Sequence, residues 1–241
     1  MDLRSDVPFP NTRWSLVAGV RGQPKVREKA LGELCGLYWM PVYAFLRRRG
    51  MGAADAQDAA QGFFVSLLDE DGFAKADAEA GKMRSFLLGA LQRWQRGEWR
   101  KSAALKRGGD REIFSMDAME AEKGFQAEEN GISPEDEFDR RCAMAVLESA
   151  LQRLAEEQEA AGKGKAFAVM RPLLSPAGTK TSQEQVAAAL GLSAEALRVA
   201  LHRLRKRFGE LLREAVADTL AKPDAASVDE EMAALRRVMT S

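Results

Sequence analysis

The sequence predicts an all-α protein built from two small helical domains joined by an acidic linker. Ala, Leu, Glu, Arg and Lys dominate the chain, and all five are good helix formers. β-branched residues do not recur with the period of two that a half-buried strand requires. Hydrophobic residues occupy 46% of the 241 positions, which is enough material for the cores of two domains.

Charge is distributed along the chain in blocks, although the totals of 36 basic and 36 acidic residues balance. Residues 82–111 hold nine basic and two acidic residues, whereas residues 112–139 hold ten acidic residues and one lysine. Residues 198–213 hold six basic residues and one acidic residue. Two basic blocks therefore flank one acidic block, which indicates surfaces with different roles.

The helical pattern divides the chain into four parts. Residues 12–107 form the first expected domain, with helices interrupted at "RGQP", "RRRGMGAAD" and "DEDGFAKADAEAGK". Residues 108–133 are acidic and rich in turn formers, which predicts a flexible linker. Ser133 and Pro134 then match a helix start with a Ser cap, and the second domain is expected over residues 134–221. The tail, residues 222–241, is expected to add one short amphipathic helix.

The stretch "SQEQVAAALGLSAEALRVALHRL", residues 182–204, has the layout of a helix-turn-helix. Gly191 allows the left-handed backbone that ends a helix, and Ser193 is placed to cap the next helix. Small Ala187 would let the two helices cross closely. We therefore expect the second of these helices to be a DNA-recognition helix.

This second helix has two different faces. Its apolar stripe recurs at spacings of three and four, which predicts a core face: Leu197, Leu201, Leu204, Phe208, Leu211 and Ala215. Polar and basic residues fall toward the other side, where early residues can reach base edges and later ones phosphates. The expected DNA contacts are Arg198, Val199, His202, Arg203, Arg205 and Lys206. The alternative is an amphipathic helix whose cations only face water.

The basic stretch "GKMRSFLLGALQRWQRGEWRKSAALKRGG", residues 81–109, contains two tryptophans with different surroundings. Trp94 shares an apolar face and is expected in the core, whereas Trp99 lies among Arg, Lys and Gln. An exposed aromatic among cations is suited to stacking on an unpaired base. The candidate single-strand contacts are Arg84, Arg93, Arg96, Trp99, Arg100 and Lys101. Alternatively, Gly97 ends the helix and Trp99 packs in an apolar seam.

A third segment, "DAQDAAQGFFVSLLDE", residues 55–70, predicts a helix with one apolar face and a short polar row. Asp55, Asp58 and Gln61 form that row, and no His, Lys or metal partner is recognisable near them. We therefore interpret them as a charged rim on a helix that docks another protein.

The sequence favours neither a cofactor nor a metal site. Cys35 and Cys142 are the only cysteines, they have no metal-ligand spacing, and both lie in apolar helical patterns that predict buried thiols. His202 is the single histidine. No stretch approaches 18 uninterrupted apolar residues, so no membrane span is expected, and the polar N-terminus does not match a signal peptide. A reducing cytoplasm fits these features.

These segments occur in an order that resembles the extracytoplasmic-function group of bacterial RNA polymerase sigma factors, in the form found in planctomycete-like bacteria. "YWMPVYAFLRRRGMGAADAQDAAQGFFVSLL" is similar to their region two, and "MRSFLLGALQRWQRGEWRK" to the segment that melts and reads the minus-ten element. "SQEQVAAALGLSAEALRVALHRLRKRF" is similar to their region-four helix-turn-helix, which reads the minus-thirty-five element. The resemblance covers about residues 14 to 215 without the linker.

The resemblance implies a binding protein rather than an enzyme. Asp55, Asp58 and Gln61 would contact core polymerase, the 84–101 set would meet the minus-ten strand, and the 198–206 set would hold the minus-thirty-five duplex. Its partners would be core polymerase and promoter DNA, with an anti-sigma factor as a further candidate and no membrane. The tail would be a regulatory arm or a helix that covers region four.

Two departures limit what the resemblance carries over. Leu91, Gln92, Arg93 and Gly97 stand where the family often has Ala-Arg-Asn followed by Asp, and Val199-Ala200 replaces a polar-basic pair. The family's base preference therefore does not transfer. The main alternative function is a helix-turn-helix regulator that binds duplex DNA without polymerase. A nucleic-acid-processing enzyme is a second alternative, but the sequence shows no nucleophile constellation or phosphate-cradling loop for it.

Overall fold

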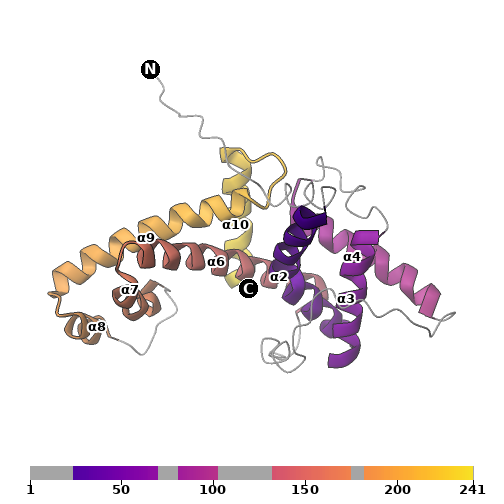
Figure 1. The fold of residues 1–241 in the computed structure, drawn as a ribbon, viewed down its shortest axis with the longest axis horizontal. Coiled ribbons are helices and arrows are strands. Elements are labelled where there is room, and N and C mark those ends of the chain that lie inside the picture. The colour runs from indigo at the N-terminus through magenta and orange to yellow at the C-terminus, as the bar shows by residue number, and fades with distance from the viewer. Residues whose placement is uncertain (1–23, 70–80, 103–131, 175–181, 241) are drawn as a thin grey trace, which may run out of the picture. The chain divides into compact units, whose positions relative to one another are not determined.

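The computed structural model describes residues 24–69, 81–102, 132–174 and 182–240, and within these ranges the regular secondary structure is helical. The expected all-α fold class is therefore confirmed. An isolated antiparallel bridge between Lys82 and Leu220 is the one pairing of extended backbone in the described ranges. The elements are α2 (Pro24–Arg48), α3 (Ala53–Asp69), α4 (Met83–Ser102), α6 (Pro134–Ala160), α7 (Gly164–Met170), η2 (Arg171–Leu174), α8 (Gln183–Leu190), α9 (Ala194–Ala217) and α10 (Ala225–Thr240). The α-helices among them are labelled in Figure 1.

The described helices belong to two compact units. The first unit combines the residues up to Ala145 with those from Val216 onward, and the second unit is Val146–Ala215. The sequence pattern placed the domain boundaries at residues 134 and 221, between helices. The compact units instead divide within the helices α6 and α9. The expected linker at residues 108–133 lies almost wholly outside the described residues.

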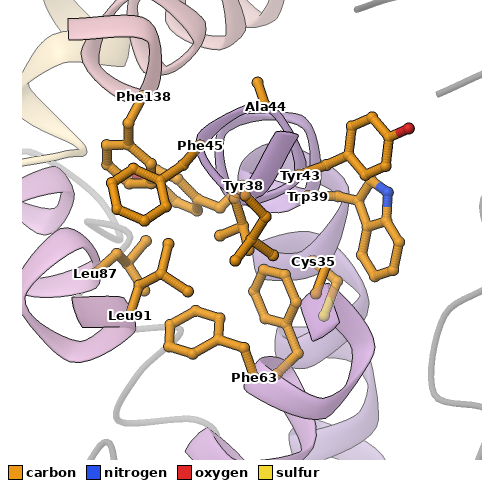
Figure 2. Packing of buried hydrophobic residues seen from close by; sticks show 14 of the residues in the cluster. Cys35, Tyr38, Trp39, Tyr43, Ala44, Phe45, Phe63, Leu87, Leu91 and Phe138 are labelled. Atoms are coloured by element: carbon orange, nitrogen blue, oxygen red, sulfur yellow. The ribbon is translucent and has the colours of Figure 1, made fainter. Parts of the chain in front are cut away.

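The core of the first unit is made by α2, α3, α4 and the first turns of α6 (Figure 2). Trp39, Phe63 and Leu91 are among its fully buried side chains. Phe138 from α6 lies edge-on to Phe45 from α2, with ring centroids 6.4 Å apart. This aromatic contact is why the start of α6 belongs to the first unit rather than to the second.

Trp94, expected in the core from its place in the apolar stripe of α4, is partly buried and packs against the core. Its ring lies edge-on to Phe63 at 6.0 Å between centroids. Gly62 faces the same indole, and a Cβ at that position would lie 3.3 Å from Trp94 Cζ2. A glycine in α3 therefore allows the close approach of α4. Cys35 and Cys142 are both buried free thiols, which confirms the packing role expected for them.

The N-terminus of α6 is the helix start expected from the sequence. Ser133 Oγ accepts a hydrogen bond of 3.0 Å from the backbone N–H of Asp136, and Pro134 is the first helical residue. Glu137 follows in the first turn and is buried, but its carboxylate is 2.7 Å from Arg141 Nε and 3.8 Å from Arg48 Nη2. Because a buried carboxylate is costly without cations nearby, these two arginines make its position in the core tolerable.

The second unit packs α7, η2 and α8 against the buried faces of α6 and α9. Its core contains Leu154, Phe167, Leu173, Val186 and Leu201. The short helix α7 continues into η2, and both contribute buried side chains. This arrangement places the end of α8 and the start of α9 next to each other, as the helix-turn-helix pattern requires.

The expected tail helix is present as α10. Its N-terminus is capped reciprocally: Asp224 Oδ1 accepts a 2.7 Å bond from the Ser227 N–H, and Ser227 Oγ accepts one of 3.0 Å from the Asp224 N–H. The chain just before α10 pairs with the chain just before α4, through Ala221 N–H to Gly81 O at 2.9 Å. The tail therefore belongs to the first unit.

None of the helices in the described ranges combines the length and hydropathy needed to cross a membrane.

Candidate nucleic-acid interface

The turn between α8 and α9 has the geometry that the sequence predicts. Gly191 has φ 62° and ψ 30°, in the left-handed region that glycine adopts without strain. The Leu192 N–H donates to Ala187 O at 2.9 Å and the Gly191 N–H to Ala188 O at 3.2 Å, which is the bond pair of a Schellman motif. This turn ends α8 after eight residues and directs the chain into α9.

Both helices of the motif begin at a serine cap. Ser182 forms a full capping box with Gln185 at the start of α8. Ser193 Oγ accepts a 3.1 Å hydrogen bond from the Ala196 N–H at the start of α9, as expected. Because these bonds are local, residues 182–196 are enough to specify the turn and both helix starts.

The helix α9 separates its apolar and basic residues as expected. Leu197, Leu201, Leu204, Leu211 and Ala215 are buried, and Phe208 is half-buried. The residues expected to contact DNA are all exposed: Arg198, Val199, His202, Arg203, Arg205 and Lys206. The amphipathic pattern therefore leaves one continuous exposed face along the first half of α9.

Most basic residues on this face have no competing side-chain partner within the described residues. The side chains of Arg198, His202, Arg203 and Lys206 make no hydrogen bond or ion pair inside those ranges. Arg205 differs, because its Nη2 donates to the carbonyl oxygen of Leu173 at 2.7 Å. That bond leaves the charge of Arg205 in place but holds its side chain against η2.

Arg207 belongs to a different surface of α9. Its Nη2 lies 2.6 Å from Glu157 Oε1, and its Nη1 lies 3.0 Å from Glu210 Oε2 and 3.6 Å from Glu214 Oε1. Hydrogen bonds from Arg207 lower the pKa of the Glu157 carboxyl, against a smaller opposing effect of burial. The three carboxylates neutralise Arg207, so the free positive charge of α9 is confined to the face that carries Arg198 and Lys206.

Two apolar side chains are exposed beside these cations. Leu192 is 38% exposed in the turn, and Val199 is 44% exposed on α9, one residue after Arg198. Single exposed apolar residues are common on protein surfaces. On a helix that enters the major groove, however, such a side chain can contact the methyl group of thymine. Leu192 was not among the site residues expected from the sequence, because a turn leucine is usually a core residue.

On α4, the structure describes part of the second basic surface. The helix continues through Gly97 to Ser102, so Gly97 does not end it. Arg93 and Arg96 are exposed. The backbone of Trp99, Arg100 and Lys101 lies in α4, but their side chains lie outside the described part of the chain, so their expected roles stay predictions.

Arg84 differs from the expectation of an open DNA contact. Its Nη1 lies 2.6 Å from Asp139 Oδ2, and its Nε lies 2.7 Å from Glu231 Oε1. Burial lowers the pKa of this guanidinium. The hydrogen bonds and charges of the two acids raise the pKa and together outweigh burial, so the guanidinium stays charged. Because both acids come from distant segments, the sequence pattern of α4 could not reveal them. Arg84 is therefore not part of the exposed basic surface that Arg93 and Arg96 form on α4.

The polar row expected on α3 lies at the surface. Asp55 and Asp58 are exposed and Gln61 is half-buried, while Ala60, Phe63 and other residues of the opposite face enter the core. The start of α3 is fixed by a 2.9 Å hydrogen bond from the Ala56 N–H to Gly52 O. The two carboxylates therefore stand on a helix whose orientation is set by core packing.

The described ranges contain no group of three or more His, Cys, Asp or Glu side chains that could hold a metal ion. No protein-family model, curated protein or solved structure matches the chain. A functional assignment therefore depends on the residues and their geometry.

Proposed function

We propose that this protein is a sigma factor of the extracytoplasmic-function type. In this proposal it binds core RNA polymerase through the start of α3 and promoter DNA through α4 and α9, and acts in the cytoplasm. It makes and breaks no covalent bond. Its role is to give polymerase a promoter preference, and an anti-sigma factor is a further candidate partner.

The observation that carries the proposal is the exposed face of α9. A Schellman turn at Gly191 and a Ser193 cap set the helix start, the leucines bury one face, and Arg198 and Lys206 stand unpaired on the other. This is the arrangement in which a recognition helix can enter the major groove while its cations meet phosphates. The pairing of Arg207 with three carboxylates supports this role of α9, because it shows that the helix carries both paired cations and unpaired cations and that the unpaired ones lie on the exposed face.

The second helical surface favours a sigma factor over an isolated DNA-binding regulator. A helix-turn-helix regulator needs only the second unit, whereas this chain also carries exposed Arg93 and Arg96 on α4 and exposed Asp55 and Asp58 on α3. The sequence of the first unit resembles the polymerase-binding region of sigma factors. Two nucleic-acid surfaces and one acidic docking row fit a protein that works on two promoter elements together with polymerase.

Transcription from purified components tests the proposal. Core polymerase that receives this protein should start transcripts at defined sites on genomic fragments, and the protein should compete with the housekeeping sigma factor for core enzyme. A regulator that acts without polymerase would do neither. If the protein neither binds core enzyme nor supports any transcript at modest ionic strength, the proposal is wrong.

The docking row provides a residue-level test of core binding. Asp58→Ala should weaken binding to core polymerase, because an exposed carboxylate on a fixed helix contributes mainly to electrostatic complementarity with a basic partner. Glu156→Gln is a matched control, since Glu156 is an exposed acid on α6 that accepts a hydrogen bond from neutral Gln152 at 3.0 Å. Equal affinities of the two variants for core enzyme would remove the row from the interface.

A further inference from the structure

A cluster of five charged residues joins three segments of the first unit at the start of α4. Lys82 and Arg84 supply two positive charges, and Asp139 from α6 with Glu230 and Glu231 from α10 supply three negative charges. Lys82 Nζ lies 3.0 Å from Glu230 Oε1 and 3.0 Å from Glu231 Oε2. The acids outnumber the cations, so this end of α4 presents no net positive charge to a nucleic acid.

Glu231 is the centre of the cluster. Its side chain is 3% exposed, and both of its oxygens are occupied: Oε1 accepts from Arg84 Nε at 2.7 Å, and Oε2 lies 3.0 Å from Lys82 Nζ. Burial raises the pKa of this carboxyl. The hydrogen bonds and charges of Arg84 and Lys82 lower the pKa, and together they outweigh burial, so the net pKa is below its ordinary value. A carboxylate this buried needs those cations, so they determine where α10 lies.

Backbone contacts also hold the start of α4 against the chain between α9 and α10. The Met83 N–H donates to Thr219 O at 3.0 Å, and the Ala221 N–H donates to Gly81 O at 2.9 Å. Ala221 packs against the core of the first unit, and Val228 of α10 is buried. Main-chain bonds therefore attach the chain between α9 and α10 to the start of α4, and ionic contacts attach α10 itself.

We propose that α10 is an autoinhibitory mask that withholds Lys82 and Arg84 from nucleic acid. This inference rests on the proposed function, because it concerns the α4 surface assigned to promoter DNA. The mask covers only the start of α4, whereas Arg93 and Arg96 farther along the helix are exposed. The phosphates of a DNA strand and the carboxylates of Glu230 and Glu231 compete for the same two cations. When α10 is displaced, the cationic surface extends to the beginning of α4.

The salt dependence of single-stranded DNA binding tests the mask in the full-length chain. Each phosphate contact on a single strand adds about 0.7 to the slope of log affinity against log salt. The Glu230→Gln/Glu231→Gln variant frees Lys82, whereas Arg84 keeps Asp139 as a partner, so the variant's slope should be steeper than the wild-type slope by about 0.7. Its control is Glu156→Gln/Glu159→Gln, which removes two exposed acids of α6. If the two variants have the same slope, the mask is refuted.

Lys82→Gln in the wild-type background tests the mask without the double glutamine variant, and the same substitution in the double-variant background adds a second comparison. If Lys82 is masked, Lys82→Gln should leave the wild-type slope unchanged and should lower the slope by about 0.7 in the Glu230→Gln/Glu231→Gln background. A full loss of about 0.7 in the wild-type background would show that Lys82 already contacts phosphate. That result would overturn the mask.

Amine-reactive labelling of Lys82, read by mass spectrometry, separates this inference from the proposed function because it needs no nucleic acid. The mask predicts slow labelling in the wild-type chain and several-fold faster labelling in Glu230→Gln/Glu231→Gln. Equal labelling rates would overturn the mask while leaving the sigma-factor proposal intact. Conversely, the protein could fail to bind polymerase and promoter while Lys82 is labelled slowly only in the wild type. That pair of results would overturn the sigma-factor proposal and support α10 as a cover of Lys82.

Discussion

Arg84 Nε donates a 2.7 Å hydrogen bond to Glu231 Oε1, although 147 positions separate the two residues in the chain. This bond connects the helix that carries the expected minus-ten surface to the last helix of the protein. Lys82 and Asp139 surround the same pair, with Asp139 2.6 Å from Arg84 Nη1. The C-terminal tail is therefore part of the first unit, and its acids are paired with cations at the start of α4.

Stability should depend on pH through Glu231. Because its folded-state pKa lies below the ordinary value of 4.5, the stabilisation is fully present above about pH 4.5 and is lost as pH falls through the folded pKa. The free energy of unfolding, measured in urea from pH 7 down to pH 3, should fall more steeply for the wild type than for Glu231→Gln. The difference isolates Glu231 from Glu157 and Asp224, whose pKa values are also lowered. Parallel profiles would contradict the ion pair.

Gly191→Ala should destabilise the helix-turn-helix. The position has φ 62°, and an added Cβ would meet no atom within 4 Å, so the penalty comes from the backbone conformation alone. We expect a loss of about 1 kcal/mol in the free energy of unfolding for Ala, and a smaller loss for Asn, which tolerates this region. Urea denaturation measures both. If Ala and Asn are equally harmless, the left-handed turn is not needed.

Arg198→Ala/Lys206→Ala should weaken binding to duplex promoter DNA and leave binding to core polymerase unchanged. Loss of two phosphate contacts would reduce the salt slope by about 1.8 for duplex DNA. Arg207→Ala is the matched control on the same helix, because Glu157 and Glu210 already neutralise that cation. Its salt slope should stay close to that of the wild type. Promoter affinity that survives the double substitution would remove this face of α9 from the DNA site.

Val199 should give the protein a preference for the methyl group of thymine. Burying one methyl-sized group contributes roughly 0.8 kcal/mol, which corresponds to about a four-fold change in affinity. Duplexes selected for binding should therefore lose about four-fold in affinity when one particular thymine is replaced by uracil. Val199→Ala, which shortens the apolar side chain, should reduce that difference. A wild type that never distinguishes thymine from uracil would show that Val199 does not contact a thymine methyl.

Local chemistry made a large part of the fold predictable. The three- and four-residue spacing of leucines identified the buried face of α9, because that spacing is a property of the helix itself. Gly191, Ser133 and Ser193 could be interpreted because each acts on backbone groups within a few positions. The thiols and Trp94 could be placed for the same reason, from the apolar stripe in which each lies.

The candidate site could be predicted only where its residues face solvent. The exposure of Arg198 and Lys206 on α9 and of Asp58 on α3 follows from their place opposite an apolar stripe. Arg84 has a similar local pattern, but its surroundings are made by Asp139 and Glu231, which are 55 and 147 positions away. The periodicity of one helix carries no information about acids that fold against it.

The amino-acid sequence by itself determined the helical class, the starts of α6 and α9, the end of α8 and the division of α9 into an apolar and a cationic face. Tertiary structure alone decided that α6 enters the first core through Phe138, that α10 joins the first unit, and that Arg84 is neutralised while Arg198 stays free. The reason is physical: helix periods and caps arise from neighbours within one or two turns. Ion pairing and core membership depend on which distant side chains the fold brings within a few ångströms.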